Sequence, residues 1–168
     1  MYAIQAPRKS IAVTVAGALL AGVGLSACGT QTSAASPSQQ TEILELAVEN
    51  SDQYAISDLP PTGTSVGDLS VYSSWLLEDG RRIGQGGGSC QVIQVDGAKV
   101  TNQCVLTARL EQGTLTLQSL YVTGESPLDM AITGGTGAYQ DAQGIARFWD
   151  IGTPQERMRA EITHPAKQ

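Results

Sequence analysis

The sequence of 168 residues contains one histidine, and only 5% of its residues are aromatic. With that single His164 near the C-terminus, no Ser-His-Asp triad can be assembled, and no second soft ligand is spaced for a metal site. No glycine loop precedes a helix in the manner of a phosphate or dinucleotide site. The sequence therefore argues against triad hydrolases and nucleotide-binding enzymes, and it predicts neither a metal nor a cofactor.

The first 27 residues have the layout of a lipoprotein signal peptide. Arg8 and Lys9 precede an apolar stretch, residues 11–23, which is too short to span a bilayer comfortably, and Leu25-Ser26-Ala27-Cys28 follows. This tetrapeptide is typical of a bacterial lipobox, in which the cysteine thiol takes a diacylglycerol. We expect residues 1–27 to be removed and Cys28 to be lipidated, giving an exported lipoprotein anchored on the extracytoplasmic face of a membrane. An ordinary secretory peptide with a coincidental cysteine is the alternative.

Residues 28–41 are predicted to be a flexible tether, because they are rich in Ser, Thr, Gln and Ala and carry almost no charge. Residues 42–168 are then enough for one folded domain. All 16 acidic residues lie after Cys28, and loss of Arg8 and Lys9 leaves 10 − 2 = 8 basic residues. Such an acidic chain disfavours nucleic acid and anionic lipid as partners. The lipid anchor remains as the expected membrane contact.

Alternating apolar and polar residues predict β-strands through most of this domain. No segment offers an uninterrupted amphipathic helix, and prolines are confined to connections. The triplet Gly86-Gly87-Gly88 precedes a strand and predicts a bend or bulge. Short antiparallel strands of this kind fit either a sandwich or a closed barrel, and the pattern alone does not choose between them. The clearest segments are 43–49, 90–95, 101–110, 114–121 and 144–150.

Cys90 and Cys104 flank Asp96-Gly97, which is a strong hairpin-turn signal. If the loop holds three residues, 96–98, the two cysteines lie opposite each other and can form a disulfide, as an oxidising compartment favours. A two-residue turn would shift the register by one and send the sulfurs to opposite faces. We therefore predict a disulfide together with a three-residue loop. Reduced thiols or a metal site are the alternatives.

Several short glycine-rich segments resemble the allene oxide cyclase and dirigent families in their order and spacing. The resemblance extends from about Glu42 to Phe148 and implies an all-β domain, an eight-stranded antiparallel barrel of the calycin-like type whose lumen admits one small ligand. It also implies dimers or trimers formed through the outer walls. The segments are Val66-Gly67-Asp68-Leu69, Ile83-Gly84-Gln85-Gly86-Gly87-Gly88-Ser89-Cys90, Leu115-Thr116-Leu117-Gln118-Ser119-Leu120-Tyr121 and Ala131-Ile132-Thr133-Gly134-Gly135-Thr136-Gly137-Ala138-Tyr139.

The same resemblance implies catalytic roles for Glu45 and Tyr121. Glu45 matches a glutamate that plant cyclases use beside the conjugated system of the substrate, and Tyr121 matches a pocket tyrosine whose hydroxyl can hold a carbonyl or epoxide oxygen. A carboxylate in a dry lumen has a raised pKa and can take a proton or stabilise a cation. Strand alternation leaves another orientation open, in which Glu45 and Glu49 point to solvent from the outer face.

Five further residues are candidates for substrate binding. Tyr72 and Ser74 match an aromatic and a polar pocket position of the family, and the two tryptophans are candidates for the lining. Separately, an inward Arg109 or Arg147 could pair with Glu45 or Glu49. The alternatives are core packing for the aromatic residues and the outer wall for the arginines. Ala47 and Ser74 replace asparagines that hold a water in the plant enzymes, so a true allene oxide is not the expected substrate. The candidates are Tyr72, Ser74, Trp75, Arg109 and Trp149.

Two functions from different classes follow from this resemblance. The first is a cofactor-free cyclase or isomerase that folds an apolar, polyunsaturated, polyketide- or fatty-acid-like substrate in the lumen until a ring closes, by pericyclic cycloaddition or by attack on a cation or epoxide. The second is a non-catalytic dirigent- or lipocalin-like protein that binds an apolar small molecule at the cell envelope. A purely structural surface lipoprotein is a third possibility.

Overall fold

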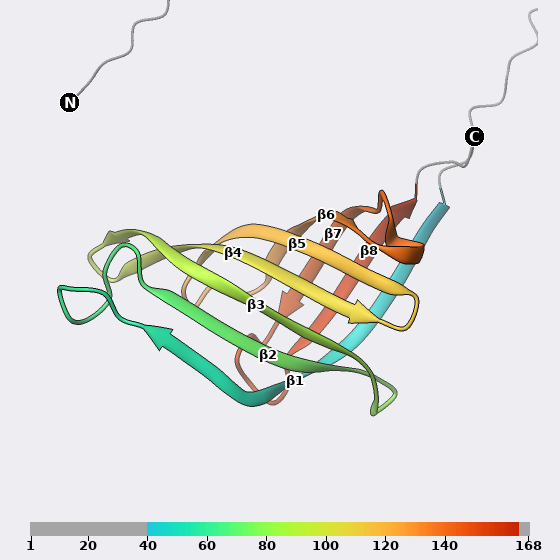
Figure 1. The fold of residues 1–168 in the computed structure, drawn as a ribbon, viewed down its shortest axis with the longest axis horizontal. Helices are drawn as coiled ribbons and strands as arrows, with labels where there is room; N and C mark the ends of the chain where they lie inside the picture. The colour runs from blue at the N-terminus through green and yellow to red at the C-terminus, as the bar shows by residue number, and fades with distance from the viewer. Residues whose placement is uncertain (1–39, 165–168) are drawn as a thin grey trace, which may run out of the picture. The chain divides into compact units, whose positions relative to one another are not determined.

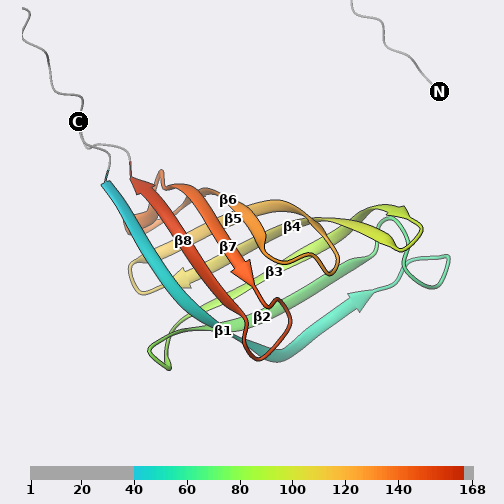
Figure 2. The ribbon, with the colours of Figure 1, turned by 180° about the vertical axis from the view of Figure 1, so that it is seen from behind.

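The computed structural model describes residues 40–164, in which eight antiparallel strands form one closed barrel in chain order (Figures 1 and 2). The predicted fold class is therefore confirmed. The predictions for the signal peptide, for Cys28 and for most of the tether lie outside the described residues. No helix among residues 40–164 has the length and apolar character needed to cross a membrane. The strands are β1 (Gln40–Ser57), β2 (Leu69–Glu78), β3 (Arg81–Asp96), β4 (Lys99–Leu110), β5 (Gly113–Val122), β6 (Leu128–Gly135), β7 (Gln143–Trp149) and β8 (Arg157–His164), with a single-turn 3-10 helix, η1 (Gly137–Tyr139).

The inner face of the barrel is apolar over the half that lies to the right in Figure 1, where β1 begins and β8 ends. Side chains that alternate along the strands meet there, and Met130, Ala160 and Ile162 are fully buried. On β1, Leu46 and Val48 point into this core, which leaves Glu45 and Glu49 on the outer face. The right-hand half of the lumen is therefore packed with side chains.

β1 changes partner along its length, and this opens the other half of the barrel. Its first part pairs with β8 from Gln40 to Ala47, whereas its later part pairs only with β2. A register irregularity between Asn50 and Tyr54 marks the bend, which is visible at the bottom of Figure 1. Beyond this point β1 and β2 continue without β8 beside them, so the lumen is open at the left-hand end.

The three glycines 86–88 lie inside β3 and form no bend, which corrects the sequence prediction. They pair in continuous register with Ser74, Ser73 and Tyr72 of β2. Their lack of a Cβ is used for close packing: a Cβ on Gly86 would come within 2.7 Å of the Ser74 hydroxyl oxygen, and one on Gly87 within 2.9 Å of the Tyr72 carbonyl oxygen. The glycines therefore let the barrel wall pack tightly on the neighbouring strands.

The β3–β4 hairpin has a two-residue turn, so the predicted three-residue loop is wrong. Asp96 pairs with Lys99, and Gly97 takes the positive φ of +57° that such a turn requires. The register then shifts between Val92 and Gln94, which makes Ile93 a bulge residue. This extra residue restores the pairing of positions 90 and 104 that the shorter turn would otherwise have lost.

Candidate functional site

A cavity of about 600 Å³ occupies the open half of the barrel. Its walls come from the later part of β1, the start of β2, the end of β3, the start of β4, the end of β5 and the loop between β7 and β8. Leu106, Met130 and Phe148 form part of an apolar floor where the cavity meets the core. A volume of this size is within the range of small-molecule sites in proteins.

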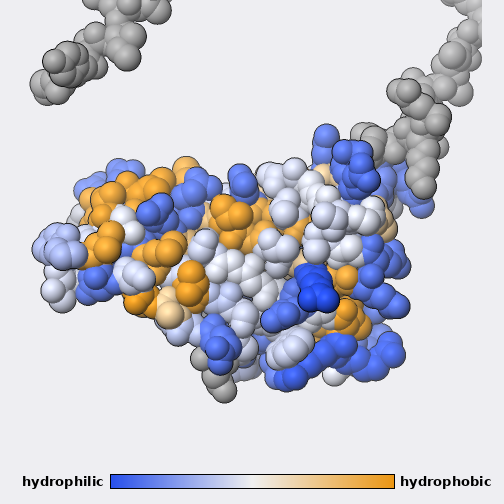
Figure 3. Space-filling model, in the orientation of Figure 1, coloured by the Kyte–Doolittle hydropathy of each residue, from blue (hydrophilic) through white to orange (hydrophobic). Residues whose placement is uncertain are grey.

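The open side of this cavity is hydrophobic. Tyr54 and Ile56, on the part of β1 that pairs only with β2, line the cavity but remain 61% and 60% exposed. Figure 3 shows hydrophobic surface gathered toward the left-hand end of the molecule, and polar surface toward the right. Val66 and Val71, from the β1–β2 connection and from β2, are also exposed in this part of the chain. An apolar ligand that enters the cavity would cover part of this surface.

Glu156 brings a carboxylate to the cavity from the loop that connects β7 to β8. The residue is only 8% exposed. Its Oε2 accepts hydrogen bonds from the Asn50 amide nitrogen at 2.8 Å and from the Gly152 main-chain nitrogen at 2.7 Å. Its carbonyl accepts a bond of 2.9 Å from the Val48 N–H, which extends the β1–β8 pairing by one step. The carboxylate is thus held by one oxygen, and residues 40–164 supply no hydrogen bond to Oε1.

Tyr72 and Tyr121 line the same cavity, as the sequence analysis predicted for both. Burial raises the pKa of Tyr72 well above its usual range, and the charges of Glu156 and Tyr121 act in the same direction. The Tyr72 hydroxyl therefore stays protonated and can donate a hydrogen bond inside the cavity. The Tyr121 hydroxyl accepts a 3.1 Å bond from the Gly124 N–H. A catalytic role for Tyr121 stays a prediction.

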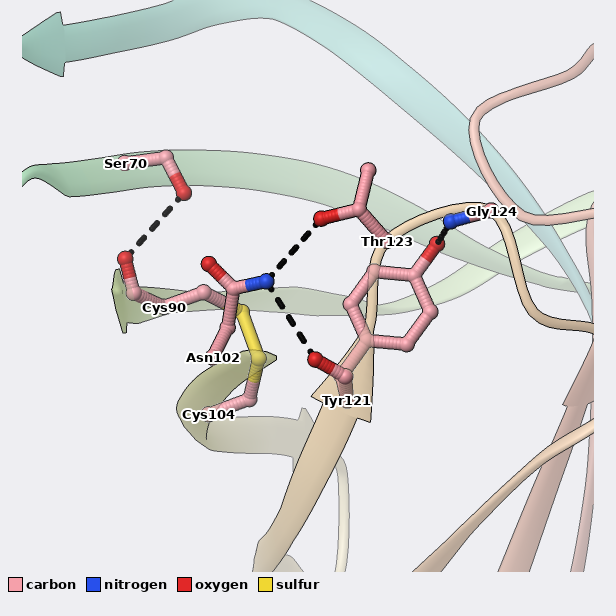
Figure 4. The surroundings of a disulfide bond; sticks show 7 residues. All are labelled: Ser70, Cys90, Asn102, Cys104, Tyr121, Thr123 and Gly124. Carbon is pink, nitrogen blue, oxygen red and sulfur yellow. Dashed lines mark hydrogen bonds between the residues drawn. A yellow bond between two sulfur atoms is a disulfide. The ribbon is translucent and has the colours of Figure 1, made fainter. Parts of the chain in front are cut away.

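The disulfide between Cys90 and Cys104 forms part of the cavity wall (Figure 4). The two residues are directly opposite in the β3–β4 pairing, with their Cα atoms 4.1 Å apart. The Ser70 hydroxyl donates a 3.3 Å bond to the Cys90 carbonyl, which links the bridge to β2. The predicted bridge is confirmed, and both sulfurs are removed from nucleophilic chemistry.

Glu45 lies on the outer wall of the barrel, which corrects the expectation that it acts in the lumen. Its side chain is 73% exposed and its Oε1 lies 3.1 Å from Nε of Arg159 on the neighbouring strand β8. Glu49 also faces outward, where Arg82 holds its carboxylate at 2.8 Å and lowers its pKa by hydrogen bonding. Strand β1 buries its apolar face, because the opposite orientation would expose Leu44, Leu46 and Val48 to water and bury two carboxylates, and both changes are unfavourable.

The other predicted substrate-binding residues lie away from the cavity. Ser74 points inward but is buried below the cavity against Gly86, with 5% exposure. Trp75 is on the outer wall under the Arg82 guanidinium, whose carbon lies 4.8 Å from the ring centroid. Arg109 is exposed on the outer face of β4. These placements correct the assignment of all three to a ligand pocket.

Trp149 and Arg147, near the end of β7, alternate with the inward-facing Phe148 and therefore lie on the outer wall. Trp149 packs against Arg157, whose guanidinium carbon is 5.2 Å from a ring centroid. Arg147 holds both oxygens of Asp129 at 2.6 Å and lowers the pKa of that carboxyl. Arg147 does not pair with Glu45 or Glu49 in the lumen, and Trp149 does not line the cavity, so the interior interpretation of both residues is wrong.

Among the polar residues of the cavity, sequence reasoning missed Asn50, Asn102 and Glu156. Glu156 lies in a connection with no periodic pattern, so nothing in the sequence points to it. Asn102 has the same strand parity as Cys104, and a disulfide in the lumen wall implies that Asn102 also faces inward. That signal was present in the sequence. Within residues 40–164, His, Cys, Asp and Glu side chains form no cluster of three or more that could hold a metal ion.

Residues 43–163 match the family described as the allene oxide cyclase barrel like domain. The chain belongs to this family. No curated protein matches the sequence.

Three solved structures with the same barrel illustrate its range. A pyocyanin demethylase is 34% identical, with a TM-score of 0.68, over 72% of this chain and 99% of that chain. The pterocarpan synthase dirigent protein GePTS1 is 18% identical, with a TM-score of 0.61, over 79% of this chain and 90% of that chain. The Diels-Alderase AbmU from Streptomyces koyangensis is 18% identical, with a TM-score of 0.60, over 76% of this chain and 64% of that chain. The last two show the shared fold alone.

Proposed function

We propose that this family member is an enzyme that binds a planar, conjugated small molecule in the cavity and removes a proton from it with Glu156. The observation that carries the proposal is the buried carboxylate, which is fixed through one oxygen and free at the other. A base held in this way faces the ligand without having to be reoriented. The 34% identity to a pyocyanin demethylase supports a substrate of the N-methylated phenazine class.

Demethylation of such a ring can be balanced with water alone. The base takes a proton from the N-methyl carbon, and the electrons of that C–H bond pass into the conjugated ring. Water then adds to the carbon, which leaves as formaldehyde, and the ring is left reduced by two electrons. Glu156 Oε1 is the acceptor for the first proton, and the Tyr72 hydroxyl donates to an oxygen or ring nitrogen of the substrate.

The apolar walls explain how a flat substrate would be held. Leu106, Phe148 and the disulfide line the cavity and offer hydrocarbon and sulfur surfaces to the faces of a ring, and Tyr54 lines its exposed side. Aromatic and sulfur contacts with a ring are favourable, and they exclude water from the carboxylate. A base in such surroundings is more effective than the same base in water.

The test is incubation of the purified protein with pyocyanin, followed by measurement of binding, of methyl loss by mass spectrometry and of formaldehyde. Glu156→Gln keeps the shape of the side chain and an acceptor for Asn50 and Gly152, so it should bind the dye but react at least about 100-fold more slowly. Glu45→Gln, on the outer wall, is the matched control and should react as the original protein does. Absence of binding, or an undiminished rate in Glu156→Gln, would overturn the proposal.

A second candidate is the cofactor-free cyclase expected from the family resemblance. Its support is the apolar floor of a cavity that is large enough to fold a linear polyunsaturated chain, and catalysis would then come from shape, with Tyr121 and Tyr72 as the polar anchors. Incubation with linear polyene or polyketide precursors distinguishes the two, because ring closure leaves the substrate mass unchanged whereas demethylation lowers it. Tight binding of either class without reaction would favour the dirigent- or lipocalin-like alternative.

We also propose that the barrel is an exported lipoprotein attached to a membrane through Cys28, and that it associates as a dimer or trimer. The lipobox supports the first proposal, and the family resemblance supports the second. Metabolic labelling with a radioactive fatty acid should mark the protein, and Cys28→Ser should abolish the label. Light scattering of the purified protein should give two or three times the mass of one chain. An unlabelled protein or a monomer would contradict the respective proposal.

A further inference from the structure

The orientation of the Asn102 amide is determined by its neighbours. Its Nδ2 lies 3.2 Å from the Tyr121 carbonyl oxygen and 3.0 Å from Oγ1 of Thr123, as Figure 4 shows. A main-chain carbonyl can only accept a hydrogen bond, so the group that faces it must be the amide nitrogen. The alternative assignment, with the amide turned by half a rotation, would set two oxygens against each other. The position of Oδ1 follows from this.

Oδ1 of Asn102 is a hydrogen-bond acceptor that the protein leaves for the cavity. Asn102 is 7% exposed and lines the cavity, and its strand parity directs the side chain inward. In the part of the chain that the structure describes, no group donates a hydrogen bond to Oδ1. Among residues 40–164, the only fully buried side-chain oxygen or nitrogen without a partner is Oγ of Ser119, so Oδ1 of Asn102 is open to the cavity, where water or a ligand can donate a hydrogen bond to it.

We propose that Asn102 selects ligands that carry a hydrogen-bond donor, such as a hydroxyl or N–H group, on the edge of a conjugated ring. This inference rests on the proposed function, because it concerns the same cavity and the same class of ring. A ligand with a donor replaces the water on Oδ1, whereas a ligand without one displaces that water and leaves the oxygen unpaired. The Asn102 acceptor therefore distinguishes between rings of the same size and shape.

The test compares 2-hydroxyphenazine, 2-methoxyphenazine and unsubstituted phenazine as probes, at a mildly acidic pH at which the hydroxyl keeps its proton. Dissociation constants are measured by calorimetry on the full purified protein. We expect the hydroxyl compound to bind at least about tenfold more tightly than the methyl ether. Unsubstituted phenazine lacks both the donor and the added methyl group, so it separates the missing hydrogen bond from crowding.

Two variants locate the effect. Asn102→Ala removes the acceptor and should bring the three probes within about twofold of one another. Thr123→Val is the matched control, because it keeps the size of a side chain that also lines the cavity and removes one of the two partners of the amide, but leaves the Tyr121 carbonyl to orient it. This variant should keep the preference. Equal binding of the three probes to the original protein would overturn the inference without the need for any variant, and an unchanged preference in Asn102→Ala would also overturn it. If none of the probes binds, the proposed substrate class fails and this inference fails with it.

Discussion

Removal of the Cys90–Cys104 disulfide should destabilise the barrel by an amount that the chain separation sets. The two residues are 14 positions apart in the sequence. In the chain-entropy model, a closed loop of this length restricts the unfolded chain by about 3 kcal/mol. The native register does not depend on the bridge alone, because the inner packing of β3 and β4 also holds it. We therefore expect the double variant Cys90→Ala, Cys104→Ala to fold, but to be less stable by about that amount.

The corresponding thermal shift can be worked out from the size of the barrel. About 125 residues with an unfolding entropy of about 2.1 cal/mol/K each give about 0.26 kcal/mol/K. Dividing about 3 kcal/mol by this value lowers the midpoint by about 11 °C. Circular dichroism melts of the oxidised protein and of the double variant measure the shift directly. Denaturant titrations give the free energy of unfolding from the same samples.

Addition of reductant provides the internal control. The oxidised protein should melt at a lower temperature in reductant, approaching the double variant, whereas the double variant itself should not respond. A shift below about 3 °C would refute the entropic reasoning, because it would mean that the unfolded chain is already restricted or that the hairpin is strained by its bridge. Reaction of either cysteine with a thiol reagent in the native, unreduced protein would refute the bridge itself.

Three further predictions concern single side chains. The Asp68 carboxylate accepts hydrogen bonds from the Leu59 N–H at 2.9 Å and from the Ser65 N–H, and these bonds lower its pKa below the usual 3.8. Asp68 therefore contributes stability above about pH 4, and this contribution is lost as the pH falls through the lowered pKa. Denaturant titrations should show that Asp68→Asn is less stable at pH 7 and lacks this acid dependence. Burial raises the pKa of Tyr72, so its contribution to stability is complete below about pH 10 and is lost at higher pH. Burial also raises the pKa of Tyr139, so ultraviolet titration should show late-ionising tyrosine absorbance, part of which Tyr72→Phe removes. Gly88→Ala would place a Cβ against the backbone of β4, so thermal melts should show a loss of at least about 2 kcal/mol, and an unchanged midpoint would contradict the close packing of β3 on β4.

The barrel could be predicted because its evidence is distributed along the whole chain. Alternation marks the strands, and the shared order of short segments distinguishes the closed barrel from a sandwich. The three glycines in the run 131–139 are typical of a strand end or a turn, and β6 ends at Gly135 while Gly137 adopts a positive φ of +62° in η1. Patterns of this kind depend on local backbone preference and on burial, which a sequence expresses directly.

The details of the hairpin and of the site depend on tertiary packing, which a sequence does not express. Asp96-Gly97 marks the turn correctly, but the bulge at Ile93 depends on how β3 twists against β4, and no residue type announces it. Glu45 was assigned to the lumen by resemblance, although the aliphatic side chains beside it compete for the same inner face. The burial of those side chains decides the orientation, and the carboxylate goes to solvent.

The location of the candidate base follows from the point at which β1 separates from β8. Pairing ends at Ala47 with Arg157, so the connection formed by residues 150–156 has to cross the open end of the barrel. Glu156 in this connection accepts hydrogen bonds from the Val48 N–H and from the Asn50 side-chain amide, and both residues belong to the part of β1 that no longer pairs with β8. Because the same departure opens the cavity and brings the Glu156 carboxylate to it, the packed half of the barrel can supply stability while the open half is left for the proposed chemistry.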